Sequence, residues 1–498
     1  MLPKNLKYQS KVESAASRSS RINIAPNNGT GPYSLGDTLI FNIPTRQNLV
    51  MNCPDSYLKF SLGTISASAN ATAIRWDSSS AHSLFQRVRI WSGSNLLQDI
   101  DNYGLLTKML FDIQVPGDAT YGKLNILAGT RSDLVVTTPT IATADAVGGA
   151  DAATAAALAN AIKASLNASK LSAMQINSGS SLVSTTDSFT FASGNATYAP
   201  GHLKANVYCL NLNCLLGTLC SQNYFPLFAC TSAPLRMEIT LVDSINKCFN
   251  IVGGASFPAG AITNVEYIAN FIELGDSAMS IVASSLQGQP LQFVVPDYRN
   301  YQFSYSLPAA SSGVGILTQV SMALPAKFSS LKSLFVAMRD NGTGAGTFFP
   351  FSSVTNGLVD YQFRIGSSIF PPKAPNTYPE MFSELVKAIG SMSDLNYQPS
   401  IDKASYTMAA SVANTIGAEG YGASNISSGS FYIGIDLDSY ANSDKTNVYS
   451  GWNSNTDDIF AIMNFNSAIN AVVNVRFDAF AMFDTCIVFE NQTAYVRY

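Results

Sequence analysis

The chain has 498 residues, only 12% of which are charged, and a formal net charge of −4 at pH 7. A chain of this length exceeds the size at which one hydrophobic core keeps growing, so two large domains are expected. The small net charge excludes a global basic field for nucleic-acid binding, and it leaves little repulsion between identical copies.

The first 21 residues form a basic, serine-rich segment ahead of the first expected strand. Five cations face a single acid, Glu13, and these cations are Lys4, Lys7, Lys11, Arg18 and Arg21. The segment lacks the apolar run of a secretory signal, so we expect synthesis inside the cell. No stretch of the chain is long and apolar enough to predict a membrane-spanning helix. The arm could contact a genome or a membrane, or it could clasp a neighbouring copy without a charge-specific partner.

Alternation of apolar and polar residues predicts short, half-buried strands early in the chain and again over residues 301–307. The apolar residues of these strands are Leu39, Phe41, Ile43, Leu58, Phe60, Leu62, Tyr301, Phe303, Tyr305 and Leu307. Gly, Pro, Asn and Ser separate the strands throughout. The pattern predicts an all-β class with minor helices.

One unit is repeated. In the first copy, Val88-Arg89-Ile90 lies in a predicted strand over 84–91, and a Ser/Gly turn follows. A helix over 102–112 comes next, with Asp101 as its expected cap. The apolar side of this helix carries Leu105, Leu106, Met109 and Leu110.

In the second copy, Phe363-Arg364-Ile365 ends a predicted strand over 361–365, and a Gly/Ser turn follows. Thr377 and Glu380 form a capping box that opens a helix expected to end at Gly390. The expected buried stripe of this helix is Phe382, Leu385, Val386 and Ile389.

A second pair of landmarks shows where the copies differ. Residues 264–269 resemble residues 474–479, and both segments read as strands. The first copy is longer by about 65 residues between its landmarks, and we place this surplus in an insertion at 116–201. Within the insertion, Leu158, Ile162 and Leu166 recur every four residues and predict a helix.

The sequence offers little for catalysis or metal binding. It has two histidines, His82 and His202, and no motif of a nucleophile elbow, phosphate loop or zinc helix. We therefore expect no catalytic and no cofactor-binding residues. Asp436, Asp438 and Asp444 are weak candidates for metal ligands, although a solvated strand end explains them as well. Seven cysteines without paired spacing favour buried thiols over disulfides or zinc.

Residues 80–106, which read SAHSLFQRVRI and then WSGSNLLQDIDNYGLL, resemble double jelly-roll major capsid proteins. The likeness is greatest to those of polinton-like viruses and virophages, within the adenovirus-related lineage. Residues 57–60 look like the early strand of that family, and residues 360–365 with 370–372 look like the matching part of its second domain. The closing residues 483–498 are similar as well.

The residues and the resemblance together predict two tandem jelly-roll β-sandwiches with loop insertions. The expected division is an arm at 1–30, a first jelly roll at 31–275 with its insertion at about 116–201, and a linker at 276–289. A second jelly roll follows at 290–498, with a shorter insertion at about 396–430.

The resemblance implies a viral major capsid protein, which is not an enzyme and needs no cofactor. It implies homotrimers of pseudo-hexagonal outline that tile an icosahedral shell, with penton and minor capsid proteins as further partners. The genome or an internal membrane could contact the N-terminal arm. The expected location is the virion, after synthesis and assembly inside the host cell.

A different class of function fits part of the pattern. A carbohydrate-binding or glycoside-cleaving β-sandwich protein would share the fold and the neutral polarity, with Trp76, Trp91 and Trp452 as stacking platforms. The internal duplication and the missing export signal favour the capsid interpretation. Oligomeric state separates the two, because a capsid subunit must assemble and an enzyme need not.

Overall fold

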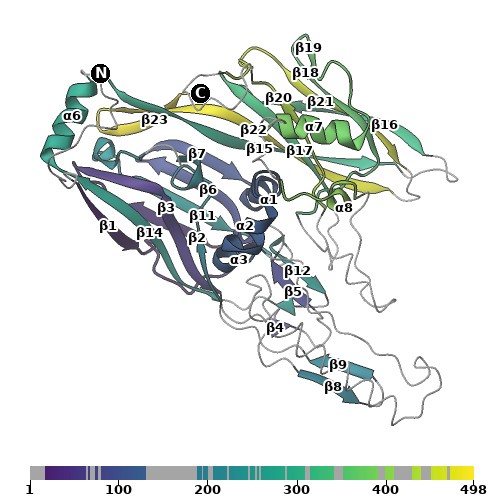
Figure 1. Ribbon diagram of the computed structural model, residues 1–498, viewed down its shortest axis with the longest axis horizontal. Helices are drawn as coiled ribbons and strands as arrows, with labels where there is room; N and C mark the ends of the chain where they lie inside the picture. Colours follow the sequence, from purple (N-terminus) through teal and green to yellow (C-terminus); the bar gives the residue numbers. More distant parts are fainter. Residues whose placement is uncertain are drawn as a thin grey trace, which may run out of the picture.

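The computed structural model describes residues 17–62, 66–67, 73–76, 80–130, 188–192, 195–199, 206–220, 224–244, 247–252, 255–256, 260–286, 289–308, 315–340, 351–390, 399–408, 429–438, 450–467 and 472–497. These residues form two β-sandwiches that lie side by side (Figure 1). Their strands pair antiparallel throughout the named sheets, which is the arrangement expected of jelly rolls.

The first sandwich consists of two four-stranded sheets. One sheet has the order β1 (Ser17–Ile24), β14 (Ile262–Leu274), β3 (Leu49–Leu62) and β10 (Asn206–Leu210). The other has the order β2 (Thr38–Ile43), β11 (Leu235–Leu241), β6 (Phe85–Ser92) and β7 (Asn95–Asp101). The sheets face each other across a core in which the Phe41 and Tyr267 rings lie 6.0 Å apart.

The second sandwich repeats this order strand for strand. Its first sheet runs β15 (Leu291–Leu307), β22 (Val473–Glu490), β17 (Leu331–Asp340) and β20 (Tyr432–Asp436), and β23 (Thr493–Arg497) pairs with β22. Its second sheet runs β16 (Ile316–Leu324), β21 (Ile459–Ser467), β18 (Leu358–Ile365) and β19 (Ser368–Phe370). The repeat found in the sequence is therefore confirmed: residues 264–269 lie in β14 and residues 474–479 lie in the equivalent strand β22.

The alternation of apolar residues is confirmed in the first sandwich. Leu39, Phe41 and Ile43 of β2 are buried, and so are Leu58 and Phe60 of β3. It holds less well over residues 301–307, where Leu307 is buried but Tyr305 remains 41% exposed. Helix α6 (Asp276–Leu286) connects β14 to β15 and occupies most of the segment expected as a linker.

Helix α1 (Tyr103–Gln114) follows β7, as expected, but Asp101 does not cap it. The N-cap is Asn102, in the left-handed conformation with φ 48°. Asp101 ends β7 instead, and its carboxylate accepts hydrogen bonds from Gln86 and Gln302 at 3.4 and 3.3 Å. The expected apolar side is confirmed, because all four of its residues are buried.

Helix α7 (Tyr378–Lys387) begins where its capping box predicts. The Thr377 hydroxyl accepts from the Glu380 amide at 3.4 Å, and the Glu380 carboxylate accepts from the Asn376 amide at 3.2 Å. The predicted C-terminus of α7 is wrong by three residues, since the helix ends at Lys387 rather than at Gly390.

The expected buried stripe of α7 is also partly wrong. The residues that the helix buries fully are Met381 and Leu385, with Ala388 just beyond its end, whereas Phe382, Val386 and Ile389 are half-buried. The helix packs against β20, where Gly434 has no side chain. A Cβ atom on Gly434 would lie 3.1 Å from Leu385 Cδ1. Because Gly434 lacks this atom, α7 can approach β20 closely through Leu385, and the buried side of the helix is centred there rather than on Phe382 and Val386.

Three loops of the first sandwich extend from one of its ends (Figure 1). Strand β5 (Ala73–Trp76) pairs with β12 (Phe249–Val252), β4 (Ser66–Ala67) pairs with β13 (Ala255–Ser256), and β8 (Ser188–Ala192) pairs with β9 (Asn195–Ala199). Helices α2 (Gly117–Tyr121) and α3 (Lys123–Ala128) begin the longest loop. The extension thus involves two loops besides the insertion at 116–201.

Some expectations fall outside the described residues. They include the helix with Leu158, Ile162 and Leu166, and most of the insertion at 396–430. Within the latter, the structure describes a short helix, α8 (Lys403–Tyr406).

Candidate functional site

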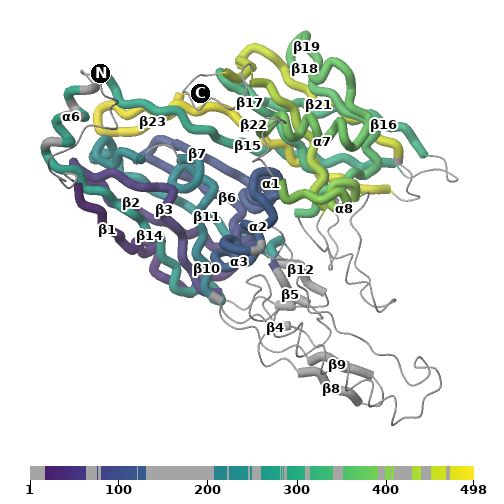
Figure 2. The backbone as a smooth tube through the Cα atoms, in the orientation of Figure 1, coloured from purple at the N-terminus to yellow at the C-terminus, as the bar shows by residue number. Residues whose placement is uncertain are grey.

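Buried polar side chains join the two sandwiches, and we call the surface between them the seam. It forms because β15, β22 and β23 extend from the second sandwich across the first, and because α1 lies between the two (Figures 1 and 2). Apolar contacts close one end of the seam. Phe225 of the first sandwich meets Phe293 and Phe489 of the second, with ring centroids 6.0 and 5.5 Å apart.

A buried carboxylate, Asp297, lies four residues beyond Phe293 on β15. Gln98 on β7 donates from Nε2 to Asp297 Oδ1 at 2.7 Å, and the Tyr298 amide donates to the same oxygen at 2.8 Å. The Leu215 amide donates to Gln98 Oε1 at 2.7 Å, which fixes the orientation of the Gln98 amide. Asp297 is 2% exposed, and burial raises the pKa of this carboxyl from 3.8 to about 7.

A second buried carboxylate anchors the start of α1. Asn102 Nδ2 donates to Asp478 Oδ1 at 2.7 Å and to Asn300 Oδ1 at 3.2 Å. Arg339 donates from Nε to Asp478 Oδ2 at 2.7 Å, so this carboxylate, unlike that of Asp297, has a cation partner. The left-handed backbone of Asn102 directs the side chain away from its own helix and into the other sandwich.

The middle of α1 is held by a buried cation. Lys108 is fully buried, and its Nζ lies 2.6 Å from Asp112 Oδ2, 2.8 Å from the Tyr432 hydroxyl and 3.0 Å from Ser430 Oγ. A buried charge is tolerated only where a counter-ion and hydrogen bonds replace water, and here the second sandwich supplies the hydroxyls. The Ser400 amide also donates to the Asp112 carbonyl at 2.9 Å.

The C-terminal strand completes the seam. The Ala494 amide of β23 donates to Ser92 Oγ at 3.2 Å, and Asn95 Nδ2 donates to the Ala494 carbonyl at 3.0 Å. Figure 2 shows this strand, in yellow, lying beside the first sandwich, where it pairs with the end of β22 that extends across. The seam therefore combines aromatic burial, backbone contacts and four buried ionisable side chains, which are Lys108, Asp297, Arg339 and Asp478.

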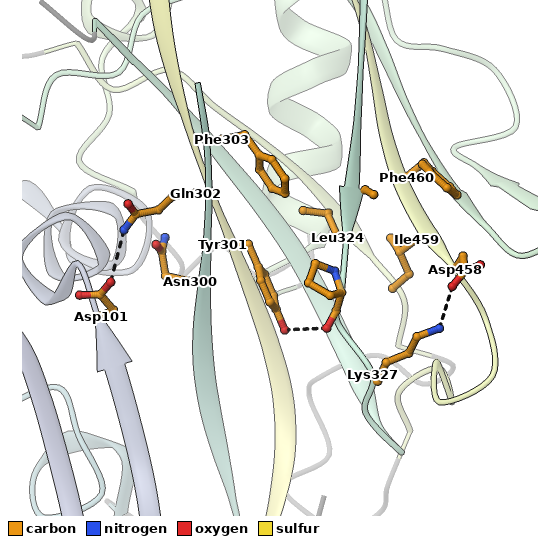
Figure 3. A pocket seen from close by; sticks show the side chains of 12 residues that line it. Asp101, Asn300, Tyr301, Gln302, Phe303, Leu324, Lys327, Asp458, Ile459 and Phe460 are labelled. Atoms are coloured by element: carbon orange, nitrogen blue, oxygen red, sulfur yellow. Dashed lines mark hydrogen bonds and ion pairs between the residues drawn. The ribbon is translucent and has the colours of Figure 1, made fainter. Parts of the chain in front are cut away.

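A cavity of about 790 Å³ lies at the edge of the seam, between β15, β16 and β21 (Figure 3). Gln302 and Asn300 point toward Asp101 of the first sandwich. Phe303 points toward Leu324, and the Tyr301 hydroxyl donates to the Pro325 carbonyl at 3.3 Å. Neighbouring residues of β15 thus serve two partners, one in each sandwich, because successive side chains of a strand point to opposite faces.

The N-terminal arm residues are divided by the structure. Arg18 and Arg21 lie in β1, which pairs with β14, so this part of the arm is itself the first strand. The Arg21 guanidinium lies 5.6 Å from the centre of the Tyr57 ring. Lys4, Lys7 and Lys11 lie outside the described residues.

The three aspartates considered as metal ligands do not form a site among the described residues. Asp436 Oδ1 accepts from the Asp438 amide at 2.9 Å, and Asp438 lies 4.0 Å from Lys332 Nζ. Asp444 lies outside the described part of the chain. No group of three or more His, Cys, Asp or Glu side chains is arranged for a metal in the residues that were searched.

The aromatic and imidazole side chains serve packing. Trp76 is fully buried and donates to the Tyr208 hydroxyl at 2.9 Å, so it cannot stack on a sugar. Trp452 donates to Asp457 at 3.0 Å and packs on Phe370. His82 is buried, and burial lowers its pKa to about 3, which keeps the ring neutral.

The sequence interpretation missed the seam residues, above all Gln98, Lys108 and Asp297. One signal was available, because Lys108 and Asp112 are four residues apart on a predicted helix whose neighbouring positions are apolar. The partners in the second sandwich lie about 200 to 320 positions away and leave no local pattern.

No protein-family model and no curated protein matches the chain. Solved structures match it over nearly its whole length. The match to the structure of PBCV-1 VP54, which was fitted into a reconstruction of the virophage Sputnik, covers 99% of this chain and 99% of that one, with a TM-score of 0.56 and 8% identity. The mavirus major capsid protein has a TM-score of 0.53 and 12% identity, and the match covers 100% of this chain and 95% of that one.

The Faustovirus major capsid protein has a TM-score of 0.54 and 10% identity, with 97% of this chain and 93% of that chain covered. These structures share with this chain the fold that its strand order defines. The protein is a double jelly roll. Among its described helices, none is both long and apolar enough to cross a membrane.

Proposed function

We propose that this protein is a viral major capsid protein whose two jelly rolls act as one building block. The observation that carries the proposal is the seam: a fold shared along the whole chain with capsid subunits is combined with a buried, hydrogen-bonded union of the two sandwiches. A subunit that tiles a shell must keep its two halves at a fixed angle, and a seam of this kind resists bending.

On this proposal, three copies form a pseudo-hexagonal block of six jelly rolls, and such blocks tile an icosahedral shell. The protein then belongs to the virion and assembles inside the host cell. Penton and minor capsid proteins would occupy lattice positions that a pseudo-hexagonal block does not fit. The role is structural, with no substrate turned over.

Two finer assignments belong to the same proposal. We assign residues 31–275 and 290–498 to separate jelly-roll domains, with residues 276–289 between them, and we add β1 of the expected arm to the first domain because it pairs with β14. The support is that each named sheet draws its strands from one side of this segment only, among the described residues. We also assign the basic residues ahead of β1 to contacts with the genome, an internal membrane or a neighbouring copy.

The alternative of a carbohydrate-binding protein has weaker support. It required exposed tryptophans, and Trp76 is buried while Trp91 packs under Arg236, 5.5 Å from its ring centre. A flat aromatic platform must be open to its ligand.

Oligomeric state tests the proposal directly. We expect light scattering of the purified chain to give three times the mass of 53.1 kDa, and negative-stain images of the same sample to show hexagonal outlines. A stable monomer at tens of micromolar would contradict the capsid assignment, and a glycan array would then be the next measurement.

A further inference from the structure

The two sandwiches are related strand by strand, so each contact in the seam has an equivalent position elsewhere in the chain. The shared sheet orders equate β1 with β15, β7 with β19 and α1 with α7. Within the chain, the side of the first sandwich formed by β7 and α1 packs on β15 of the second. Two equivalent surfaces remain: the side formed by β19 and α7, and the strand β1.

Both of these surfaces are open in the described chain. Strand β1 pairs on one edge only, with β14, and most of its side chains are exposed. Helix α7 buries two of its ten residues, whereas α1 buries nine of twelve. Part of the difference arises because Ser400, Ser430 and Tyr432 of the second sandwich cover α1, and part because residues 80–84 of its own sandwich pack on it.

The uncovered side of α7 has the character of a contact surface. A groove of about 570 Å³ runs along it, lined by Tyr378, Pro379, Phe382, Ile401 and Tyr406. Tyr378 is 39% exposed, and Ile369 on β19 is 48% exposed. Apolar side chains left open beside a groove favour a protein partner.

The strand register identifies the residues that should meet. Val265 of β14 is equivalent to Val475 of β22, so Asn270 of β14 is equivalent to Phe480 of β22. Their partners are Arg21 on β1 and Asn300 on β15, which makes these two residues equivalent. In the seam, Asn300 accepts a hydrogen bond from Asn102, the N-cap of α1, at 3.2 Å. The equivalent of Asn102 is Thr377, the N-cap of α7.

Arg21 is therefore equivalent to Asn300, which contacts the N-cap of α1 in the seam. In a second copy, the corresponding contact of Arg21 would be at the start of α7. The first turn of α7 carries an exposed carboxylate, Glu380, so the charges are complementary. The exposed guanidinium of Arg21 would also favour the carboxylate of Glu380 over the hydroxyl of Thr377 as its acceptor, because a charge-assisted hydrogen bond is the stronger one.

We propose that β1 of one copy docks on the β19 and α7 side of a second copy, with Arg21 paired to Glu380, and so repeats between copies the contact that joins the two sandwiches within one. This inference rests on the proposed function, since it names the surface through which the trimer closes. Contacts of a single type would then join all six jelly rolls of the block.

Charge exchange between copies tests the pair. We expect the wild-type protein to be trimeric, Arg21→Glu and Glu380→Arg each to be mostly monomeric at the same micromolar concentration, and the double variant to be trimeric again, all by light scattering. Like charges at a contact oppose association, and restored opposite charges remove that opposition. Circular dichroism spectra and melting temperatures of the monomeric variants show whether they remain folded.

A matched control is Lys247→Glu, which reverses an exposed cation paired with Asp243 at 2.7 Å in the loop between β11 and β12. It should stay trimeric. Trimeric single variants, a monomeric double variant or a monomeric control would each overturn the proposed surface while leaving the capsid assignment intact. A monomeric wild-type protein would overturn both.

Discussion

Helices α1 and α7 occupy the same position in the two sandwiches but are held by different chemistry. Helix α1 is anchored by Asn102 and Lys108, whose partners belong to the other sandwich. Helix α7 is anchored by Leu385 and Met381 on its own sheet, and its polar cap faces solvent. Duplication has kept the topology, while burial between sandwiches has required charge partners at α1 that α7 does not need.

The outer faces of the equivalent sheets show the same divergence. On the first sandwich, Arg89 and Arg236 pair with Glu238 at 3.2 and 3.0 Å. On the second, Asn464 links an amide to a carboxylate, since it accepts from Gln319 at 3.2 Å and donates to Asp360 at 2.6 Å. Both faces are solvated, so either chemistry serves, and surface ion pairs of this kind contribute only about 0–1 kcal/mol.

The largest expected effect removes the apolar anchor of α7. Leu385→Asp would place a carboxylate in a fully buried position against β20, and we expect the free energy of unfolding of the second sandwich to fall by more than about 4 kcal/mol. Thermal unfolding followed by circular dichroism measures this change. Lys387→Ala, on the exposed side of the same helix, should alter stability by no more than about 0.5 kcal/mol.

A comparable melting curve for Leu385→Asp and the wild-type protein would contradict the placement of α7. It would mean that the helix does not depend on its own sandwich, and the contrast with α1 would disappear.

The second prediction removes the charged anchor of α1. Lys108→Ala would leave the Asp112 carboxylate beside the hydroxyls of Ser430 and Tyr432 without a cation, and we expect a loss of about 3–5 kcal/mol in urea unfolding. The double variant Lys108→Met with Asp112→Leu should recover much of this loss, since no charge is then buried.

Lys247→Ala provides the matched control, because it breaks an exposed pair at the same sequence spacing and should change stability by no more than about 0.5 kcal/mol. If Lys108→Ala were as mild as this control, the buried network would not be what holds α1 to the second sandwich.

Features with a local origin were predictable from the sequence. The alternation of Leu39, Phe41 and Ile43 fixed a strand, and Thr377 with Glu380 fixed the start of α7, because both patterns act over a few residues. Asp101 was a plausible cap that failed because Gln86 and Gln302 bind its carboxylate instead. A cap predicted from neighbouring residue types does not take account of such competition from residues distant in the sequence.

The seam and the loop extension were not predictable for the same physical reason. Gln98 meets Asp297, and β5 meets β12, only after the chain has folded, and neither pairing needs a particular residue spacing. The internal repeat, the strand patterns and the resemblance to capsid proteins together predicted the double jelly roll, but none of them indicated which side chains join the two sandwiches.

The smallest expected effect concerns pH and distinguishes the two buried carboxylates of the seam. Asp478 has Arg339 as its partner, whereas Asp297 accepts hydrogen bonds from neutral donors. Because burial raises the pKa of Asp297 from 3.8 to about 7, the folded protein keeps this carboxyl protonated up to neutral pH while the unfolded chain ionises it above about 4. Ionisation therefore favours the unfolded chain progressively from pH 4 to 7, and the penalty is constant above that range.

Asp297→Asn resembles the protonated acid, since its Oδ1 can still accept from Gln98 and Tyr298. We expect the wild-type protein to lose up to about 4 kcal/mol of stability relative to this variant as pH rises from 4 to 8, measured by urea unfolding at each pH. The difference in free energy of unfolding between the variant and the wild-type protein should grow through that pH window and then level off. Parallel pH profiles for the two proteins would show that Asp297 is ionised in the folded state near pH 4, and that the seam stabilises a charge there as it does at Asp478.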